Sequence, residues 1–436
     1  MHLELNALRK LLITAAASAA TLGCLALLTA SDAPDVRLYV AVLVLGTAAS
    51  VASAWRATGL TAASVLWAAV GLHLVALVGA PRFEDDYFRF LLDGWRTLTT
   101  GSPYGLPPAA LFGDASVPAA LEPVLDGVNN PDAPTIYGPV LQAIFALCFA
   151  VFGTEERGLR AVFALCNLLV IGLLLRRLPA GRVALYAFNP ALIAELVLHS
   201  HPDGVMVLLL VAGLGAARTP WLAGLCFGLA AGAKIVALAA WPALLRKGPV
   251  AVIGAVAGLL LVYAPFVLQG STAGLDGAET FATQWRFNSF AFAVLSFALG
   301  DGGARLAAGL IGGALILYAH ARDTQFQAMS GHWIFGAVLL VSPVINAWYL
   351  AWILPFALSS RQIWPWAASI ALPLSYSTGL NLGISGLAAY GVHPLARLLE
   401  ILLIGGALAW DLKRARQSSH PLQYRDEKAI TTGAGR

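Results

Sequence analysis

Charge is scarce in this chain: only 11% of its 436 residues are Asp, Glu, Lys or Arg, whereas 59% are hydrophobic. One soluble core cannot bury that much apolar surface, so the composition excludes an ordinary soluble protein. We predict an all-α polytopic membrane protein whose main solvent is lipid. Each internal charged residue becomes informative, because ionised groups near hydrocarbon are costly and usually functional.

Other features are missing as well. The four cysteines show no CxxC or Cys/His ligand spacing, so neither a disulfide framework nor a zinc site is indicated. The sequence has no Walker motif and no Gly-rich dinucleotide loop, which argues against a nucleotide-binding domain of either kind. The net charge of +4 gathers at the chain ends, which favours membrane orientation over nucleic-acid binding (Arg9, Lys10, Lys413, Arg414 and Arg416).

Long apolar runs recur along the chain and predict about 11 to 14 transmembrane helices. We assign residues 1–411 to the transmembrane domain and residues 412–436 to a disordered cytoplasmic tail. Residues 11–29 resemble the apolar part of a signal peptide but are long enough to span, so we predict an uncleaved first helix. The candidate spans are 11–29, 37–54, 60–80, 138–153, 158–175, 182–199, 203–217, 221–245, 249–269, 303–320, 331–345, 347–360, 363–380 and 393–411.

Basic residues set the predicted orientation. With the basic N-terminus inside, three crossings deliver residues 82–137 to the periplasmic side of the inner membrane, and counting back from the basic tail gives the same polarity. Arg176, Arg177 and Arg182 do not fit this count. We therefore expect that one of the segments 138–153 and 158–175 is re-entrant or interfacial, and that the helix around Lys234 is broken. Both are tolerated only where protein or water satisfies the freed backbone.

The predicted periplasmic loop 82–137 carries an unusual density of charge. Its apolar residues recur at spacings of three and four, which predicts a helix lying in the membrane interface. Asp86, Arg89, Asp93 and Arg96 are three, four and seven residues apart and share one helical face. Two interpretations stay open from the pattern alone: an active site, or a solvated face whose charges neutralise each other.

Six motifs, in order, resemble those of the C-type membrane glycosyltransferases, and most nearly the bacterial polyprenyl-phosphate-mannose-dependent mannosyltransferases. Gly138 departs from the pattern, because relatives usually have a second proline there, and Pro202 stands where an apolar residue is common. The matching strings are Asp85-Asp86-Tyr87-Phe88-Arg89-Phe90-Leu91-Leu92-Asp93-Gly94 with Gly101-Ser102-Pro103-Tyr104, Asn130-Pro131-Asp132-Ala133-Pro134-Thr135-Ile136-Tyr137-Gly138-Pro139, Phe188-Asn189-Pro190, His201-Pro202-Asp203, Gly228-Leu229-Ala230-Ala231-Gly232-Ala233-Lys234 and Ser342-Pro343-Val344-Ile345-Asn346-Ala347-Trp348-Tyr349.

The resemblance implies inverting transfer of a hexose, most simply mannose, from a polyprenyl-phosphate-linked donor to a glycan, lipid or protein acceptor. It places the general base on Asp86, with Asp85 beside it, and phosphate contact on Arg89. Phosphate is a good leaving group, so one carboxylate and one or two cations suffice. Paired acids also suit a divalent cation, but the resemblance implies no cofactor and no metal ligand. The other predicted substrate-binding residues are Asp93, Arg96, Tyr137, His201, Asp203, Lys234, Asn288, Trp348 and Tyr349.

Each of these residues also has a purely structural interpretation. Lys234 either snorkels to the membrane edge or serves a lipid phosphate. Asp203 is also a good helix N-cap, and Trp348 and Tyr349 are typical of an aromatic belt. As an alternative class, a secondary transporter or a lipid or glycan flippase also needs intramembrane charge, but such proteins usually show an internal repeat, and we find none.

Overall fold

The computed structural model describes residues 19–29, 35–57, 59–81, 83–323, 325–378 and 391–419. Within these ranges the regular elements are all helices, which confirms the all-α prediction. After a first helix, Ala19–Thr29, the elements are α2 (Val36–Arg56), α3 (Ala62–Val78), α4 (Asp86–Thr100), η1 (Pro108–Leu111), η2 (Ala119–Leu121), α5 (Glu122–Asp126), α6 (Pro139–Phe152), α7 (Glu156–Leu175), α8 (Ala180–Ala187), α9 (Pro190–Ile193), η3 (Ala194–Leu198), α10 (Asp203–Gly215), α11 (Pro220–Ala233), η4 (Ile235–Lys247), α12 (Pro249–Val267), α13 (Leu275–Gln284), α14 (Ala291–Arg322), η5 (Phe326–Ala328), α15 (Gly331–Val341), η6 (Ala347–Tyr349), α16 (Leu350–Ala357), α17 (Trp364–Ala371), η7 (Leu372–Thr378) and α18 (Pro394–Ser419).

Four helices in the described ranges are long and apolar enough to cross a membrane: α2, α7, α12 and α14. The predicted spans 37–54, 158–175 and 249–269 coincide with the first three. Many of the other predicted spans correspond to shorter apolar helices of 10–17 residues, such as α3, α6, α10 and α11. The chain is therefore a polytopic membrane protein that combines full-length helices with shorter ones.

Breaks in the helices explain why many are short. The pair α8 and Pro190–Leu198 bends by 54° at Pro190, which has no N–H to continue the helix. As predicted, the helix around Lys234 is broken: α11 ends at Ala233, Lys234 is extended (φ −140°, ψ 126°), and η4 follows. Backbone freed in this way is tolerated in a membrane only where protein or water satisfies it.

The last helix runs further than predicted. α18 continues through Ser419, whereas the sequence suggested a disordered tail from residue 412. Its last turns carry Lys413, Arg414 and Arg416, and positive charge stabilises the negative end of a helix dipole. The rest of the tail, the N-terminal residues 1–18 and residues 30–34 after the first predicted span lie outside the described residues.

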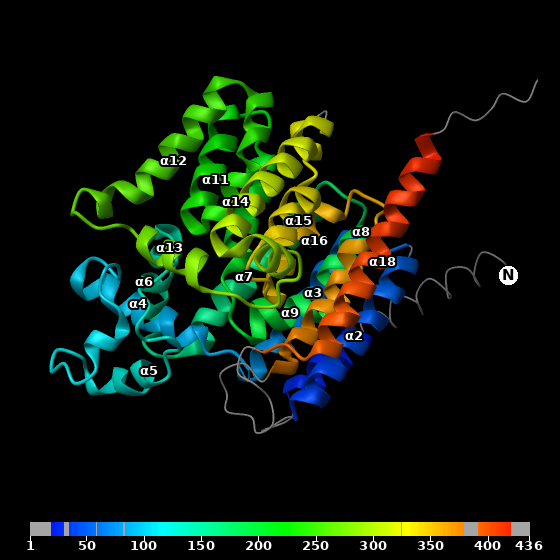
Figure 1. Ribbon diagram of the computed structural model, residues 1–436. Helices are drawn as coiled ribbons and strands as arrows, with labels where there is room; N and C mark the ends of the chain where they lie inside the picture. Colours follow the sequence, from blue (N-terminus) through cyan, green and yellow to red (C-terminus); the bar gives the residue numbers. More distant parts are fainter. Residues whose placement is uncertain are drawn as a thin grey trace, which may run out of the picture.

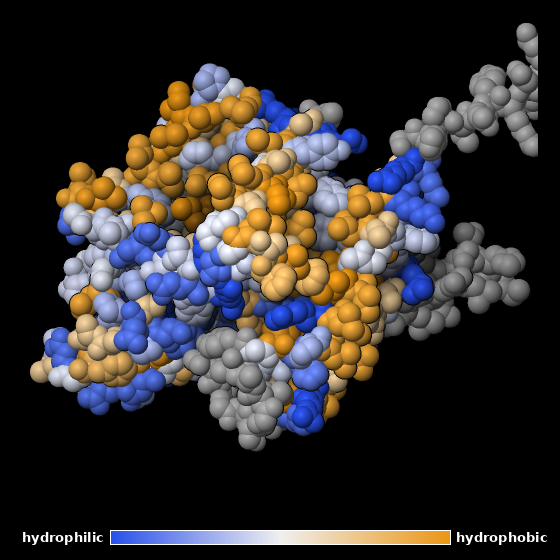
Figure 2. Space-filling model, viewed as in Figure 1, coloured by the Kyte–Doolittle hydropathy of each residue, from blue (hydrophilic) through white to orange (hydrophobic). Residues whose placement is uncertain are grey.

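The predicted loop 82–137 forms a separate layer of short helices. Figure 1 shows α4 and α5 on the opposite side of the structure from α2 and α18. In Figure 2 hydrophilic side chains gather over this layer, whereas apolar ones cover α12 and α18. Leu261 of α12 and Leu402 of α18 are examples, 67% and 60% exposed. Exposed leucines on long apolar helices are what contact with lipid requires.

Helix α4 packs closely on α6. A Cβ atom added to Gly94 would lie 2.4 Å from the Phe145 carbonyl oxygen, so only glycine fits at this crossing. The stripe of α4 residues from Arg89 to Arg96 is buried as a result, while Asp86 at its first turn stays half-buried. The Asp93-Gly94 pair of the sequence motif thus fixes the direction in which α4 presents Asp86.

Candidate active site

A cavity of about 640 Å³ opens between the α4 layer and the helical body. Its walls come from four distant parts of the chain: the start of α4 with the loop before α6, the break at Lys234, the α13 region, and η6. Among the predicted site residues, those that line it are Asp85, Asp86, Arg89, Tyr137, Lys234, Trp348 and Tyr349.

The Asp86 carboxylate is held from two sides at the edge of this cavity. Its Oδ1 accepts from Asn129 Nδ2 at 2.9 Å, and its Oδ2 accepts from the Tyr137 hydroxyl at 3.1 Å. Burial and the Asp86 charge raise the pKa of the Tyr137 phenol well above its ordinary value, so the phenol keeps its proton and donates. A carboxylate has about four hydrogen-bond acceptor positions, so Asp86 can accept a further hydrogen bond from a group in the cavity.

Three carboxyl groups follow one another at this edge but differ in environment. Asn129 Nδ2 also donates to Asp85 Oδ1 at 2.5 Å, so one amide group bridges the two aspartates. Glu84 is buried, and burial followed by the neighbouring Asp86 charge raises its pKa well above the ordinary value. Glu84 therefore favours the neutral acid, while the half-buried aspartates face the cavity.

The Arg89 guanidinium donates to backbone carbonyls in the loop before α6. Its Nη1 donates to the Ala133 carbonyl at 2.8 Å, and its Nη2 donates to the carbonyls of Asn129 and Asn130 at 3.1 and 3.0 Å. The guanidinium lies one helical turn after Asp86 and holds the segment that carries Asn129. These contacts position the loop around the carboxylate, although the sequence predicted phosphate contact for this arginine.

Asp93 and Arg96 share the predicted face of α4 but do not line the cavity. Asp93 Oδ2 accepts from Thr135 Oγ1 at 2.5 Å and from Gln142 Nε2 at 3.0 Å, and Arg96 Nη1 donates to the Leu106 carbonyl at 2.7 Å. Burial raises the pKa of Asp93, partly offset by Arg89. Both residues tie α4 to its loops.

Lys234 lines another part of the cavity wall and is paired with a buried carboxylate. Its Nζ lies 2.8 Å from both oxygens of Asp203, whose side chain is fully buried. Trp352 Nε1 donates to the same carboxylate at 2.5 Å. The lysine side chain is 17% exposed, so its charge is neutralised from behind while the group still faces the cavity.

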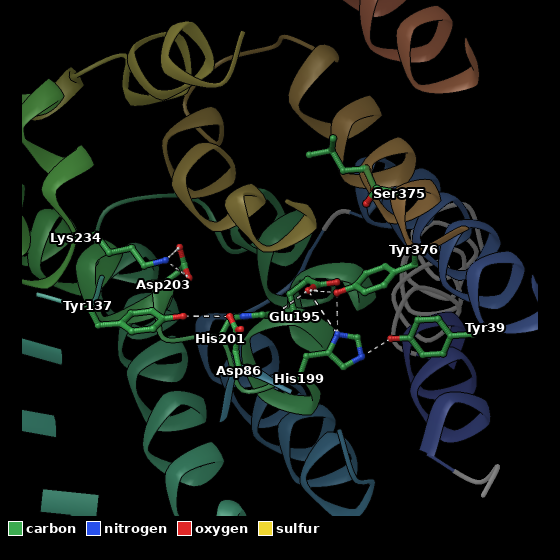
Figure 3. A network of polar contacts seen from close by, with 11 residues as sticks. Tyr39, Asp86, Tyr137, Glu195, His199, His201, Asp203, Lys234, Ser375 and Tyr376 are labelled. Carbon is green, nitrogen blue, oxygen red and sulfur yellow. Dashed lines mark hydrogen bonds and ion pairs between the residues drawn. The ribbon is translucent and has the colours of Figure 1, made fainter. Parts of the chain in front are cut away.

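Gly138 brings the two sides together. A Cβ atom at this position would lie 2.3 Å from the carbonyl oxygen of Gly232, so the start of α6 touches the end of α11 through bare backbone. This contact sets Tyr137, which binds Asp86, close to the break that carries Lys234, as Figure 3 shows. Relatives usually have a proline at this position. Here the residue is glycine, and the close contact with Gly232 leaves no room for a Cβ atom.

The remaining predicted residues lie behind or beside the cavity wall. The His201 ring stacks on Trp348 with centroids 3.7 Å apart, and Tyr349 stacks on Trp352 at 4.0 Å. Asn288 is buried next to the lining residue Phe287 but does not line the cavity.

Sequence reasoning missed Asn129, Trp352 and Glu195. Glu195 is a fully buried carboxylate within an apolar run, a signal that was available from the sequence. Asn129 precedes a motif that we had recognised, but nothing in the sequence tied its amide to the aspartates.

Among the described residues, one group of side chains could hold a metal ion: Glu195, His199 and His201.

We expect Arg89→Ala to loosen the loop more than it weakens donor binding, because three carbonyls lose their donor. Turnover should fall by up to about 100-fold, the cost of a small misplacement of a catalytic group. Arg89→Lys should restore little, since a point charge cannot serve three acceptors in a fixed fork. Hydrogen exchange at residues 129–133 is the measurement. Arg96→Ala is the matched control, because it frees Leu106 instead, and unchanged exchange at 129–133 would argue against the clamp.

Apolar spanning helices and a charged cavity at one side define the class: a multi-pass α-helical membrane protein with a polar chamber. The family described as alpha-(1->6)-mannopyranosyltransferase, N-terminal domain, matches residues 8–247, more than half of the chain, and the protein belongs to this mannosyltransferase family. No curated protein and no solved structure matches it. The resemblance drawn from the motifs is confirmed, and the protein is a membrane glycosyltransferase that needs a sugar donor and an acceptor.

Proposed function

We propose that the protein transfers mannose from a polyprenyl-phosphate donor to a hydroxyl group of an envelope glycan or lipid, with Asp86 as the general base. The observation that carries this is the half-buried Asp86 carboxylate, oriented by Asn129 and Tyr137 at the edge of a cavity of about 640 Å³ that Lys234 also lines. Ligand cavities are commonly about 300–1,000 Å³, so this one suits a sugar with its phosphate.

The reaction needs little more than these groups. The acceptor oxygen bonds to C1 of the sugar as the bond between C1 and the phosphate oxygen breaks. The acceptor proton passes to Asp86, and the bonding electrons leave with the polyprenyl phosphate. Because the leaving group is already an anion of low basicity, it needs cations rather than a general acid.

Lys234 and Arg286 are the cations that we assign to the phosphate. Both line the cavity, and the Arg286 side chain is 44% exposed while paired with Asp301. Arg89 supports the base through the loop instead. Ile235, Val236 and Phe281 also line the cavity and offer apolar surface for the start of the isoprenoid chain.

The family description adds stereochemistry to this proposal. An α-(1→6) product formed by inversion at C1 requires a donor in which the mannose is β-linked to phosphate. A general base on one side of the sugar and cations on the other suit such an in-line displacement, because nucleophile and leaving group lie on opposite faces. Trp348 and Tyr349 supply aromatic faces on which a sugar ring can stack.

The test is a transfer assay with the full-length protein in nanodiscs, a synthetic short-chain polyprenyl-phosphate [¹⁴C]mannose, and a mannose oligosaccharide acceptor. The β-phosphate donor should give a radiolabelled product with an α-linkage, sensitive to a linkage-specific mannosidase. The α-phosphate anomer and GDP-mannose should give none. Transfer from GDP-mannose in the absence of lipid donor, or from the α-anomer with equal rate, would overturn the proposed donor.

We further propose that the cavity opens on the periplasmic side of the inner membrane, as the positive-inside count predicts. Ala115 is exposed on the layer that covers the cavity. In a background with the four native cysteines replaced, Ala115→Cys should react with an impermeant maleimide in intact spheroplasts, whereas Arg414→Cys should react only after lysis. The reverse pattern would place the cavity on the cytoplasmic side.

A further inference from the structure

Behind the cavity wall lies a second polar cluster that the transfer mechanism does not use. Glu195, His199 and His201 are each at most 1% exposed, and their ligand atoms lie within 4.8 Å of one another. Figure 3 shows them pointing toward a common centre, with Tyr39 and Tyr376 around them. The π-helical turn η3 and the left-handed residue Ser200 (φ 69°) turn the three side chains to the same side.

The hydrogen bonds within this cluster leave polar atoms unpaired. Glu195 Oε1 and His201 Nε2 have no hydrogen-bond partner among the described residues. His201 Nε2 lies 3.5 Å from Glu195 Oε2, beyond the usual range for an N–H···O bond. A buried carboxylate oxygen and a buried ring nitrogen without partners are costly, and a cation bound by both side chains would offset that cost.

The separations suit a small metal coordination shell. Glu195 Oε2 lies 3.6 Å from His199 Nδ1 and 3.5 Å from His201 Nε2. Zinc binds nitrogen and carboxylate oxygen at about 2.0–2.2 Å, so neighbouring ligands in a four-coordinate shell are roughly 3.3 Å apart. Two imidazoles and one carboxylate favour zinc or a similar transition metal over calcium or magnesium, which prefer oxygen.

The surrounding tyrosines provide the outer contacts that metal ligands usually have. The Tyr39 hydroxyl lies 2.6 Å from His199 Nε2, so with Nδ1 on a metal the Nε2–H donates to Tyr39. The Tyr376 hydroxyl donates to Glu195 Oε2 at 2.8 Å and lies 3.2 Å from His199 Nδ1. These contacts hold the His199 ring and the Glu195 carboxylate in orientation.

We propose that Glu195, His199 and His201 bind one divalent transition-metal ion of the zinc type. The ion holds the His201 ring in place, and because this ring stacks on Trp348, it positions one aromatic wall of the cavity. The ion lies behind Trp348, so its role is positioning and no group of the transfer reaction bonds to it. The metal site itself does not depend on the proposed donor or on Asp86 as the base.

The experiment is a metal titration of the full-length protein in nanodiscs after removal of metal by a chelator. Co²⁺ should bind at one equivalent per chain with the visible d–d bands of a four-coordinate site, and Zn²⁺ should displace it. Glu195→Gln and His201→Asn should weaken binding by more than about 100-fold, and Tyr39→Phe by about 10- to 100-fold, the usual effect of removing an outer contact.

Two variants serve as controls. His393→Ala removes an exposed histidine outside the cluster, and Asp86→Asn removes the proposed base; both should bind the metal as the wild type does. The second control separates this inference from the proposed function, because it abolishes transfer and spares the metal. If the wild-type protein takes up neither Co²⁺ nor Zn²⁺, or if the His201→Asn and Tyr39→Phe proteins bind them unchanged, the metal site is overturned.

Discussion

Asp86→Asn should lower the rate of mannosyl transfer by about 2 to 4 orders of magnitude, the usual worth of a general base. The amide keeps the shape of the side chain, and its oxygen can still accept a hydrogen bond from the Tyr137 hydroxyl. In the wild-type protein this hydroxyl lies 3.1 Å from Asp86 Oδ2. It cannot take a proton from the acceptor hydroxyl. Turnover of the β-phosphate donor by purified protein is the measurement, and affinity for a non-hydrolysable donor analogue should stay near that of the wild type.

Asp85→Asn is the matched control for this variant. Asp85 shares the same Asn129 amide, whereas the Tyr137 hydroxyl donates to Asp86, the proposed base, so the loss of Asp85 should cost much less. Near-normal turnover in Asp86→Asn would move the base to Asp85, the neighbouring carboxylate that lines the cavity. An equal loss in both variants would indicate that the pair acts as one unit.

Lys234→Met should destabilise the protein and abolish donor binding at once. The substitution leaves the Asp203 carboxylate fully buried, with only the Trp352 N–H as a donor among its described contacts. Removing one member of a buried ion pair typically costs about 3–5 kcal/mol. Thermal unfolding in detergent should show a clear drop in melting temperature, and the donor analogue should no longer bind.

A double variant separates these two effects. Lys234→Met with Asp203→Asn removes the unpaired charge, so most of the lost stability should return. Donor affinity should not return, because the phosphate still lacks its cation. Recovery of both would mean that the lysine only neutralises Asp203, the structural interpretation that the sequence left open.

Much of the fold could be predicted from local patterns. The apolar runs gave α2, α7 and α12 almost to the residue, because a spanning helix needs continuous apolar sequence. The spacing of three and four in loop 82–137 gave α4. Both signals depend only on neighbours in the chain. The broken helix at Lys234 was predicted in another way, because Arg176, Arg177 and Arg182 did not fit the count of crossings.

The partners of the charged residues could not be predicted in the same way. Arg89 and Asp86 share a face of α4, yet Arg89 reaches the carbonyls of Asn129, Asn130 and Ala133, which are 40 to 44 positions away. Asp93 faces Thr135 and Gln142 rather than the cavity. A helical pattern says which residues share a face, but the direction of that face depends on contacts such as the one between Gly94 and Phe145.

The walls of the cavity come from separate stretches of the chain, and this has a consequence for how such proteins diverge. Asp86, Tyr137 and Lys234 lie within residues 8–247, the range shared with the mannosyltransferase family, whereas Trp348 and Tyr349 lie beyond it. Substitutions in the second group reshape the chamber without disturbing the contacts that orient Asp86. Acceptor preference can therefore drift among homologous chains while the chemistry of bond formation stays constant.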